Sequence, residues 1–223
     1  MTALSSVTLA TVAGVNIDGA QEALVRSLRG LRFARVMLLA PAPPTILDPR
    51  IEHVHIEPLT LRGYNLFMLQ RMHKYVETAH VLTVQPDGYV LNPERWDPVW
   101  LSFDYVGAPW PEQLRTRKYT ILLKNRVGNS GFVLRSRRLL QLTARADLSK
   151  LHFPILSDDL ITCVAMYEDL LDFGIQFPDV HTAATFSIEH PQAAFGHTMA
   201  DTFGFHGAHY LGELQAAGKS TSL

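Results

Sequence analysis

The first 90 residues alternate between segments typical of β-strands and segments typical of amphipathic α-helices. Residues 80–84, His-Val-Leu-Thr-Val, form a nearly continuous apolar strand of the kind found at the buried centre of a parallel sheet. Apolar residues at helical spacing predict one helix from Asp18, with Gln21 completing its N-terminal cap, and a second helix over 64–78. The other predicted strands cover 7–15, 35–39 and 51–56. This order predicts an α/β fold with a mostly parallel central sheet and helices on both faces.

The composition favours one sizeable core: 47% of the 223 residues are apolar. We expect a single domain over 1–223, with an ordered core over 7–210 and a flexible tail over 211–223. The 20 Lys and Arg nearly balance the 21 Asp and Glu, which argues against binding of nucleic acid by bulk charge. The single cysteine, Cys163, excludes an intramolecular disulfide and a cysteine-rich zinc site.

No apolar run reaches the roughly 18 residues of a membrane span. The first six residues also lack the basic region of a secretory signal. We therefore expect a soluble, cytoplasmic protein.

The second half of the sequence is less regular. Ser157, Asp158 and Asp159 form a good N-terminal signal for a helix that extends to residue 171. From residue 177 onward turn signals dominate. The other predicted elements are a short helix over 96–103, strands over 105–108 and 119–123, and a strand over 129–134 that runs into a helix over 136–142.

Polar residues lie where several predicted strands end. Segments 15–16, 39–40 and 85–88 follow three strands, and ligands bind outside the carboxyl ends of the strands in such sheets. No G-x-G-x-x-G and no P-loop lysine motif occurs, which weighs against the usual dinucleotide and P-loop sites. Within Gln-Pro-Asp-Gly at 85–88, Asp87 could ligate a divalent cation that holds a diphosphate. Pro-Asp-Gly is also a common turn, in which Asp serves turn geometry alone.

Further segments carry side chains suited to ligand binding, each with a structural alternative. The glycines at 128 and 131 flank Asn129, whose amide could bind sugar hydroxyls, or this segment is a tight bend before a core strand. Asp158 and Asp159 either cap a helix or present one carboxylate that accepts a proton from an attacking hydroxyl.

His206 and Trp110 are also candidates for ligand binding, and each has a structural alternative. His206 could reach a metal or a phosphate, or it closes the C-terminal segment as a satisfied, partly buried histidine. Trp110, in an aromatic-rich loop, could stack on a sugar or a base, or it anchors that loop.

The order of these motifs resembles a family of small glycosyltransferase-like proteins of bacteria, fungi and large viruses. More broadly it is similar to the GT-A glycosyltransferases, which use nucleotide sugars. The resemblance covers roughly residues 7–210 and implies a single GT-A-like, Rossmann-like domain. The motifs that carry it are 85–88 with 91–93, 104–110, 127–132, 158–159 and 203–207.

The resemblance implies a cation and diphosphate site at the end of the central strand. GT-A enzymes carry Asp-x-Asp there, whereas this chain has Gln85 in place of the first acid, Asp87 as the metal-facing acid, and Gly88 after it. His206 resembles the late histidine that touches the metal or diphosphate. Asp87 and His206 would then hold Mn²⁺ or Mg²⁺ together with substrate phosphates and water. The missing first acid leaves the dependence on metal open.

Most of the remaining assignments follow from the same resemblance. It implies that Asp159 is the general base, that Asp158 caps the helix or positions groups near the acceptor, and that Trp110 lies on the acceptor side. It also implies that Val12 and Asn16 hold the base of the nucleotide, and that Asn129 and Gly131 line the donor-sugar or acceptor pocket. The topology alone suggests that Arg62, Tyr64 and Asn65, at the start of the second helix, face the nucleotide.

The function implied by the resemblance is transfer of a hexosyl or deoxyhexosyl group from a nucleoside-diphosphate sugar. The acceptor would be a hydroxyl of a glycan or lipid-linked saccharide in polysaccharide biosynthesis, with inversion through a carboxylate base. Two alternatives stay open. The missing acid at Gln85 motivates a catalytically inactive nucleotide- or carbohydrate-binding module. A metal-dependent hydrolase using Asp87 and Asp158 with the histidine-rich C-terminal segment is disfavoured by the lack of compact metal-ligand spacing.

Overall fold

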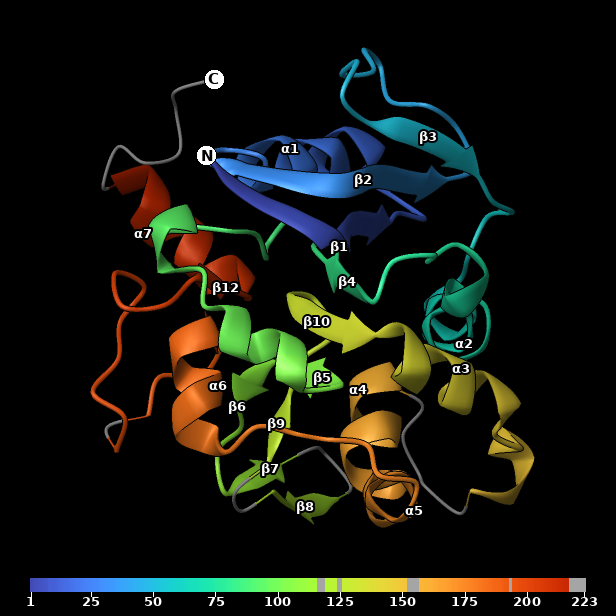
Figure 1. Cartoon of the computed structure of the whole chain (residues 1–223), viewed down its shortest axis with the longest axis vertical. Helices are drawn as coiled ribbons and strands as arrows, with labels where there is room; N and C mark the ends of the chain where they lie inside the picture. Colours follow the sequence, from blue (N-terminus) through green and yellow to red (C-terminus); the bar gives the residue numbers. More distant parts are fainter. Residues whose placement is uncertain (116–118, 124–125, 152–156, 193, 217–223) are drawn as a thin grey trace.

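A computed structural model describes residues 1–115, 119–123, 126–151, 157–192 and 194–216. Within this part of the chain, the largest sheet has six strands in the order β3-β2-β1-β4-β10-β5 (Figure 1). Its strands are β1 (Thr2–Val12), β2 (Leu31–Ala40), β3 (Glu52–His55), β4 (His80–Thr83), β5 (Tyr105–Val106) and β10 (Val133–Ser136). The sheet thus joins four strands from the beginning of the chain to the later pair β5 and β10.

The four strands from the first half are parallel, and β10 runs antiparallel to both β4 and β5. Helix α1 (Ile17–Ser27) connects β1 to β2, and α2 (Leu61–Gln70) lies between β3 and β4. Such crossovers are what parallel neighbours require. All four residues of β4 are buried, in keeping with its central place. The predicted α/β fold with a mostly parallel sheet is confirmed.

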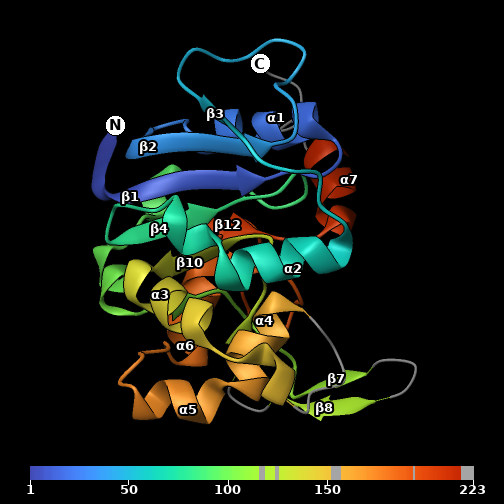
Figure 2. The same cartoon turned by 90° about the vertical axis from the view of Figure 1, so that its right-hand side faces the viewer.

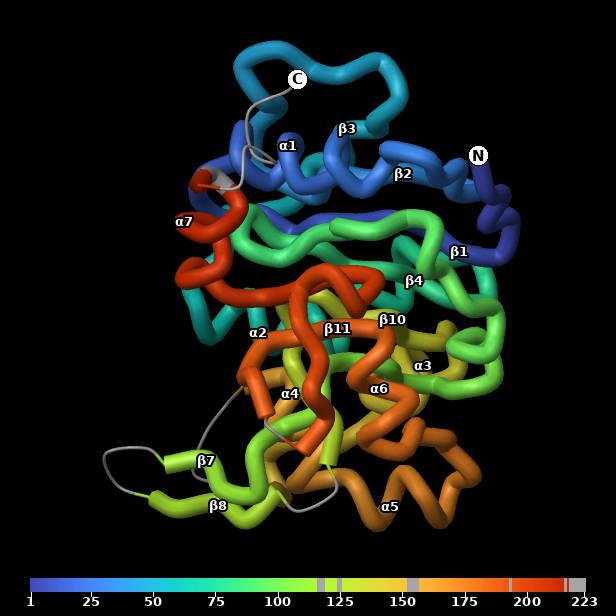
Figure 3. Tube along the Cα trace, turned by 90° about the vertical axis from the view of Figure 1, so that its left-hand side faces the viewer, coloured from blue at the N-terminus to red at the C-terminus, as the bar shows by residue number. Residues whose placement is uncertain are grey.

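Helices cover both faces of this sheet. Figure 2 shows α2 and α3 (Arg137–Arg145) on one side, and Figure 3 shows α1 and α7 (Ala208–Ala216) on the other. Apolar side chains of α1 and α7, such as Leu24 and Leu214, share one buried cluster with β1 and β2. Phe67 and Met72, in and after α2, share another with the opposite face of the same strands. From Val7 to Val12 β1 is buried on both faces, so its alternating side chains contribute to two cores.

The helix boundaries in the first half differ from the predicted ones. Asn16, not Asp18, caps α1, and its side chain accepts from the Gly19 backbone N–H at 3.2 Å. Asp18 and Gln21 instead hold the loop at 45–48: Thr45 N donates to Asp18 at 2.8 Å, and Asp48 N donates to Gln21 at 2.9 Å.

The predicted strand 7–15 and helix 64–78 are also shifted. β1 starts earlier and ends at Val12, so that residues up to 16 form a loop. α2 begins after Thr60, whose side chain accepts from Gly63 N at 3.1 Å, and ends at Gln70. A separate 3₁₀ turn at 72–74 replaces the predicted last part of the helix.

The C-terminal quarter contains more regular structure than its turn signals predict. α6 (Val180–Phe186) starts at Asp179, whose carboxylate accepts from two backbone N–H groups. Its Phe186 packs with Trp100, Phe132 and Phe203 in an aromatic core. Residues 211–216, predicted as part of a tail, lie in α7, whereas 217–223 lie outside the described residues. Phe186 packs on aromatic residues that are distant in the sequence, so local turn signals could not predict this helix.

The remaining elements are short. Residues 158–172 form α4 (Asp158–Leu160), a π-turn over 161–165 and α5 (Tyr167–Asp172), close to the predicted helix 158–171. Two 3₁₀ turns, 93–95 and 98–102, replace the predicted helix 96–103. No helix within the described ranges is long and apolar enough to cross a membrane. The small strands are β6 (Ala108–Pro109), β7 (Gln113–Arg115), β8 (Thr120–Leu122), β9 (Val127–Gly128), β11 (Ser187–Ile188) and β12 (Gly204–Phe205).

Candidate functional site

A cavity of about 460 Å³ opens at the carboxyl ends of β1 and β4. Its size lies within the roughly 300–1,000 Å³ range of small-molecule sites, and its position is the one at which ligands bind open α/β sheets. Four residues that the sequence assigns to the nucleotide side line it: Val12, Asn16, Tyr64 and Gln85. We call this space the donor-side cavity.

The donor-side cavity forms where two helices start. β1 ends at Val12, and Asn16 adopts a left-handed conformation with φ 49° that turns the chain into α1. α2 starts on the other side of the cavity, whose wall includes Thr60 and Leu61. Arg62 lies in the first turn of α2 and is exposed. The N-terminal ends of two helices, which carry partial positive charge, therefore border this space, whereas Arg62 does not line it.

Gln85 and Asp87 lie in a tight turn that follows β4. The backbone N–H of Gln85 donates to the Gly88 carbonyl at 2.8 Å, and Gly88 N donates back to the Gln85 carbonyl at 2.9 Å. The Gln85 side-chain amide donates to the Tyr64 hydroxyl at 2.8 Å in the donor-side cavity. The predicted turn is thus confirmed.

Asp87 lies next to His206, more than 100 positions later in the sequence. Asp87 Oδ1 is 3.7 Å from His206 Nε2, and the other ring nitrogen, Nδ1, lies 3.0 Å from Glu189 Oε1. Burial lowers the pKa of His206, but the hydrogen bond and charge of Glu189, with the charge of Asp87, raise that pKa above its ordinary value overall. Two acids on opposite sides of one ring therefore favour the imidazolium form.

Two glycines make room for the His206 ring. A Cβ on Gly131 would lie 2.1 Å from the ring, and a Cβ on Gly88 would lie 3.0 Å from it. The backbone N–H of Gly207 also donates to the Asp87 carbonyl at 2.8 Å, which fixes the histidine segment against the turn. Close backbone approach is the reason for glycine at both positions.

Asp87 and His206 fit one divalent cation in part. Neighbouring ligands of an octahedral ion at about 2.1 Å lie about 3 Å apart, slightly less than the 3.7 Å between Oδ1 and Nε2. Glu189 on Nδ1 is the kind of outer partner that orients a metal-binding histidine. Within the described ranges no group of three or more His, Cys, Asp or Glu is arranged to hold a metal ion. Substrate phosphates and water would have to supply the other ligands.

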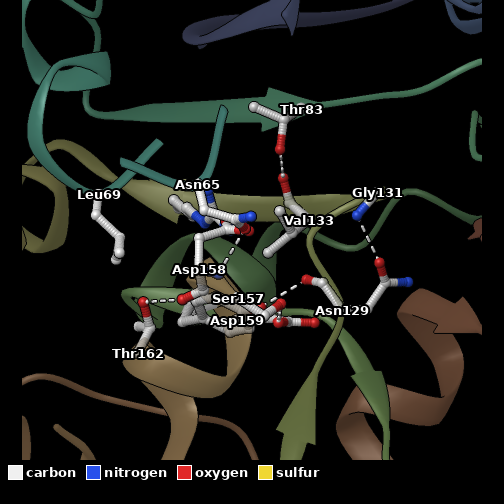
Figure 4. A network of polar contacts seen from close by, with 12 residues as sticks. Asn65, Leu69, Thr83, Asn129, Gly131, Val133, Ser157, Asp158, Asp159 and Thr162 are labelled. Carbon is white, nitrogen blue, oxygen red and sulfur yellow. Dashed lines mark hydrogen bonds and ion pairs between the residues drawn. The ribbon is translucent and has the colours of Figure 1, made fainter. Parts of the chain in front are cut away.

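The two neighbouring aspartates have different environments (Figure 4). Asp158 is 1% exposed; Arg135 Nη2 donates to its Oδ2 at 2.5 Å, and its backbone N–H donates to Asn65 Oδ1 at 2.9 Å. Asp159 accepts hydrogen bonds from the Ser157 hydroxyl and from Leu160 N. Only Asp158 has a cation beside it.

The pKa of Asp159 is raised to about 6. Burial is the main cause, and the charge of Asp158 adds to it, while the hydrogen bonds from Ser157 and Leu160 act in the opposite direction. Such a carboxyl is ionised at neutral pH and binds a proton more readily than an ordinary aspartate. The charge of Asp159 also contributes to the raised pKa of His206, so the two groups are near each other.

Asn129 and Trp110 serve the structure more than the sequence suggests. Asn129 has φ 83°, and its Oδ1 accepts from Gly131 N at 2.6 Å and from Phe132 N at 3.3 Å. Only its buried Nδ2 is left without a partner among the described residues. Trp110 is 6% exposed and packs so closely on Gly128 that a Cβ there would lie 1.9 Å from the ring. The ring therefore has little surface to offer an acceptor.

Asn65 also differs from its predicted place. It is buried below the donor-side cavity, where its Nδ2 donates to the Leu61 carbonyl at 2.9 Å. Its Oδ1 holds the start of α4, so it connects α2 to the acidic pair.

Sequence reasoning missed Arg135 and Glu189. A charged residue inside the apolar strand Phe-Val-Leu-Arg-Ser is a signal for a buried partner, and this could have identified Arg135. Glu189 follows a two-residue strand in a segment read as turns, where no local signal exists.

Comparison with known proteins places the chain in a family. The chain belongs to the family described as "Protein of unknown function (DUF5672)", whose model matches residues 50–206. That range includes the turn at 85–88, the acidic pair and His206, whereas the end of β1 precedes it. No curated protein matches the chain in sequence.

Among solved structures, the chain is similar to a glycosyltransferase involved in the glycosylation of the major capsid of PBCV-1. The sequence identity is 16% and the TM-score is 0.48, over 91% of this chain and 92% of that one.

Proposed function

We propose that this protein transfers a glycosyl group from a nucleoside-diphosphate sugar to a hydroxyl of a saccharide or lipid-linked saccharide. One observation carries the proposal: the donor-side cavity adjoins the turn of Asp87, because Gln85 and Pro86 belong to both. Tyr64 also lines this cavity, and the charges of Asp158 and Asp159 contribute to its raised pKa. In this proposal the cavity holds the nucleoside, the turn at Asp87 holds the diphosphate, and Asp159 at the start of α4 is the base.

In this proposal the nucleoside occupies the donor-side cavity, and the diphosphate lies toward Asp87 and His206. The raised pKa of His206 supports this placement, because an imidazolium donates to phosphate oxygens. Exposed Arg62 at the start of α2 is a second cation for the phosphates. A cation held by Asp87 and His206, where present, would take the place of the imidazolium proton and would neutralise charge on the leaving diphosphate.

Asp159 acts as the general base in the proposed reaction. The acceptor oxygen attacks the anomeric carbon and forms the new C–O bond, and its proton passes to an Asp159 oxygen. The bond from the anomeric carbon to the diphosphate breaks, and the diphosphate leaves with the electron pair. A pKa of about 6 suits this role near neutral pH. Asp158, tied to Arg135, positions the helix start instead of reacting.

A nucleotide panel tests the donor assignment. Thermal shifts are measured with UDP, GDP, dTDP and CDP, each with and without Mn²⁺, for the wild type and Asp87→Asn. We expect one nucleotide to raise the melting temperature, since a ligand at about 100 times its Kd adds roughly 2.7 kcal/mol of stability. Loss of the Mn²⁺-dependent part in Asp87→Asn would support a cation at this turn. No shift with any nucleotide, in folded protein, would refute the proposal.

Turnover of the donor sugar identified by that panel tests the base. We expect Asp159→Asn to lower turnover by roughly 10²–10⁴ without weakening nucleotide binding. The matched control is Asp172→Asn, which changes an exposed aspartate of α5 and should leave turnover unchanged. Wild-type turnover in Asp159→Asn would remove this residue from the role.

A catalytically inactive nucleotide-binding module is the second candidate. The observation that favours it is Gln85, whose amide is tied to Tyr64 in the place where related chemistry needs a carboxylate. Such a module predicts a nucleotide shift but no consumption of any donor sugar, with or without acceptor. Release of free nucleoside diphosphate from a donor therefore separates the two candidates.

A further inference from the structure

A second cavity, of about 420 Å³, lies on the face of the molecule that carries α7 (Figure 3). None of its lining residues lines the donor-side cavity. Its apolar wall includes Leu91, Ile188, Met199 and Leu214. The volume lies within the roughly 300–1,000 Å³ range of small-molecule sites. We call this space the α7 cavity.

Two polar side chains on the wall of the α7 cavity lack partners. Tyr210 is 3% exposed, and its buried hydroxyl has no hydrogen bond within the described ranges. His197 also lines the cavity, and both of its ring nitrogens are buried without a partner there. Folded proteins rarely leave buried polar atoms unpaired, because such atoms lose their bonds to water. A ligand in the cavity would supply the missing partners after the two side chains, whose unpaired atoms are covered in the structure, turn toward it.

The charges at the α7 cavity disfavour an anionic ligand. Burial, with the charges of Glu213 and Glu189, raises the pKa of Tyr210 to about 12, so its hydroxyl stays protonated at neutral pH. Burial lowers the pKa of His197, so its ring is neutral and offers one donor and one acceptor. The carboxylate of Glu213, also on the wall, repels anions. Hydroxyl groups, which both donate and accept, match this set.

Glu189 links the α7 cavity to the candidate site. It directly follows Ile188, which lines the cavity, and its Oε1 lies 3.0 Å from His206 Nδ1. Its other oxygen, Oε2, is buried without a partner among the described residues. Because Glu189 influences both Tyr210 and His206, a ligand in the cavity lies near the proposed reacting groups.

We propose that the α7 cavity binds one uncharged pyranose ring of the saccharide acceptor. The C–H face of the ring packs on Leu91 and Met199, and ring hydroxyls bond to Tyr210 and His197. The word "acceptor" rests on the proposed function, whereas carbohydrate binding at this cavity does not.

Methionine methyl groups provide the direct test. The protein is labelled at its methionine ¹³C-methyl groups and titrated with the methyl pyranosides of glucose, galactose, mannose and rhamnose, and with anionic methyl glucuronide. Met199 lines the α7 cavity, whereas Met68 and Met72 lie in the core on the opposite face of the sheet. We expect at least one neutral glycoside to shift the Met199 signal alone, and the glucuronide to leave it unshifted. No Met199 shift with any neutral glycoside would overturn the inference.

Removal of one hydroxyl then tests the contact. We expect Tyr210→Phe to weaken glycoside binding about two- to tenfold, the usual effect of one hydrogen bond. Its melting temperature should not fall, because the Tyr210 hydroxyl has no protein partner to lose. Tyr75→Phe, on the opposite face of the sheet, is the matched control and should bind like the wild type. Equal binding by Tyr210→Phe and wild type would contradict the proposal.

The outcomes separate this inference from the proposed function. Glycoside binding without any nucleotide shift would retain a carbohydrate site and refute glycosyl transfer. Nucleotide shifts without glycoside binding would refute the α7 cavity as an acceptor site and retain the donor side. Asp87→Asn should bind glycosides like the wild type, because Asp87 does not line the α7 cavity.

Discussion

Asp158 and Asp159 are neighbours in sequence with opposite tasks in the fold. Asp158 is almost fully buried and has the guanidinium of Arg135, itself 3% exposed, as its counter-ion. Asp159 has only a hydroxyl and a backbone N–H as donors, and burial raises its pKa. Because a buried charge needs a partner, the guanidinium of Arg135 compensates the carboxylate of Asp158. The pair therefore supplies one carboxylate held in a buried ion pair and one group, Asp159, that can exchange a proton.

Replacement of Arg135 tests this buried pair. Arg135→Met should lower the free energy of unfolding by about 3–5 kcal/mol, because the Asp158 carboxylate is left buried and unpaired. The double variant with Asp158→Leu should lose much less than the sum of the two single changes. Both are measured by urea unfolding. Arg95→Met is the control, since its pair with Asp201 is exposed, spans 3.8 Å, and should be worth about 0–1 kcal/mol. Additive losses would show that the two side chains do not depend on each other.

Residue identity in the sequence reveals some of this chemistry and hides the rest. Asp87, Asp159 and His206 stand out as polar residues within the motifs of the sequence, and the structure places Asp87 Oδ1 3.7 Å from His206 Nε2. Their roles stay predictions. Glu189 could not be found, because its importance comes only from its 3.0 Å approach to His206. Likewise, the sequence cannot show that the side-chain oxygen of Asn129 already accepts a hydrogen bond from Gly131 N in its own loop.

At the scale of elements, strong periodicity decides what can be predicted. The strands and helices of the first half are long and alternate cleanly, so their order and the parallel sheet follow from the sequence. Several strands of the second half have only two residues, such as β9, β11 and β12, and no pattern exists at that length. Their positions depend on aromatic packing around Trp100 and Phe203.

Substitution of Gly131 tests whether His206, which follows β12, must lie against the turn after β4. In Gly131→Ala the added Cβ would lie 2.1 Å from the His206 ring, so the ring must leave Asp87 and Glu189. We expect turnover of the donor to fall about 10²-fold, as for a misplaced catalytic group, and stability to fall by about 1–3 kcal/mol.

Gly212→Ala is the matched control for this change. No atom lies within 4 Å of the added Cβ, and the position is within α7. Turnover should therefore be unchanged, and stability should rise by about 0.5–1 kcal/mol because Ala favours helix. Wild-type turnover in Gly131→Ala would show that the place of His206 does not matter.

At the scale of the whole molecule, the candidate site joins segments from Val12 to His206. The C-terminal segment returns to the sheet through a bridge between Val90 and Gly204 and through the bond from Gly207 N to the Asp87 carbonyl. Local patterns carry no information on such contacts. For this reason the resemblance in motif order, and not periodicity, led to the expectation that Asp87 and His206 act together.

The pH dependence of the free energy of unfolding tests whether the buried Asp159 carboxylate destabilises the fold. Its pKa is 3.8 as a reference value and about 6 in the fold. Between these values the folded chain binds more protons than the unfolded chain, so the contribution of Asp159 to the free energy of unfolding decreases as pH rises, by up to roughly 3 kcal/mol. Asp159→Asn lacks this decrease. The variant should therefore gain stability over the wild type across this window and keep the gain above pH 6.

Urea unfolding at pH 4, 5, 6 and 7 measures that difference. Groups that titrate in both proteins, such as His80, whose pKa burial lowers, largely cancel when the variant is compared with the wild type. Asp172→Asn, which changes an exposed carboxyl of α5, is measured in parallel as the control for loss of one carboxylate. A flat difference for Asp159→Asn would mean that its carboxyl is an ordinary one. A rising difference, together with lost turnover, would show that stability is given up to keep a proton acceptor ready, as expected of a group retained for function.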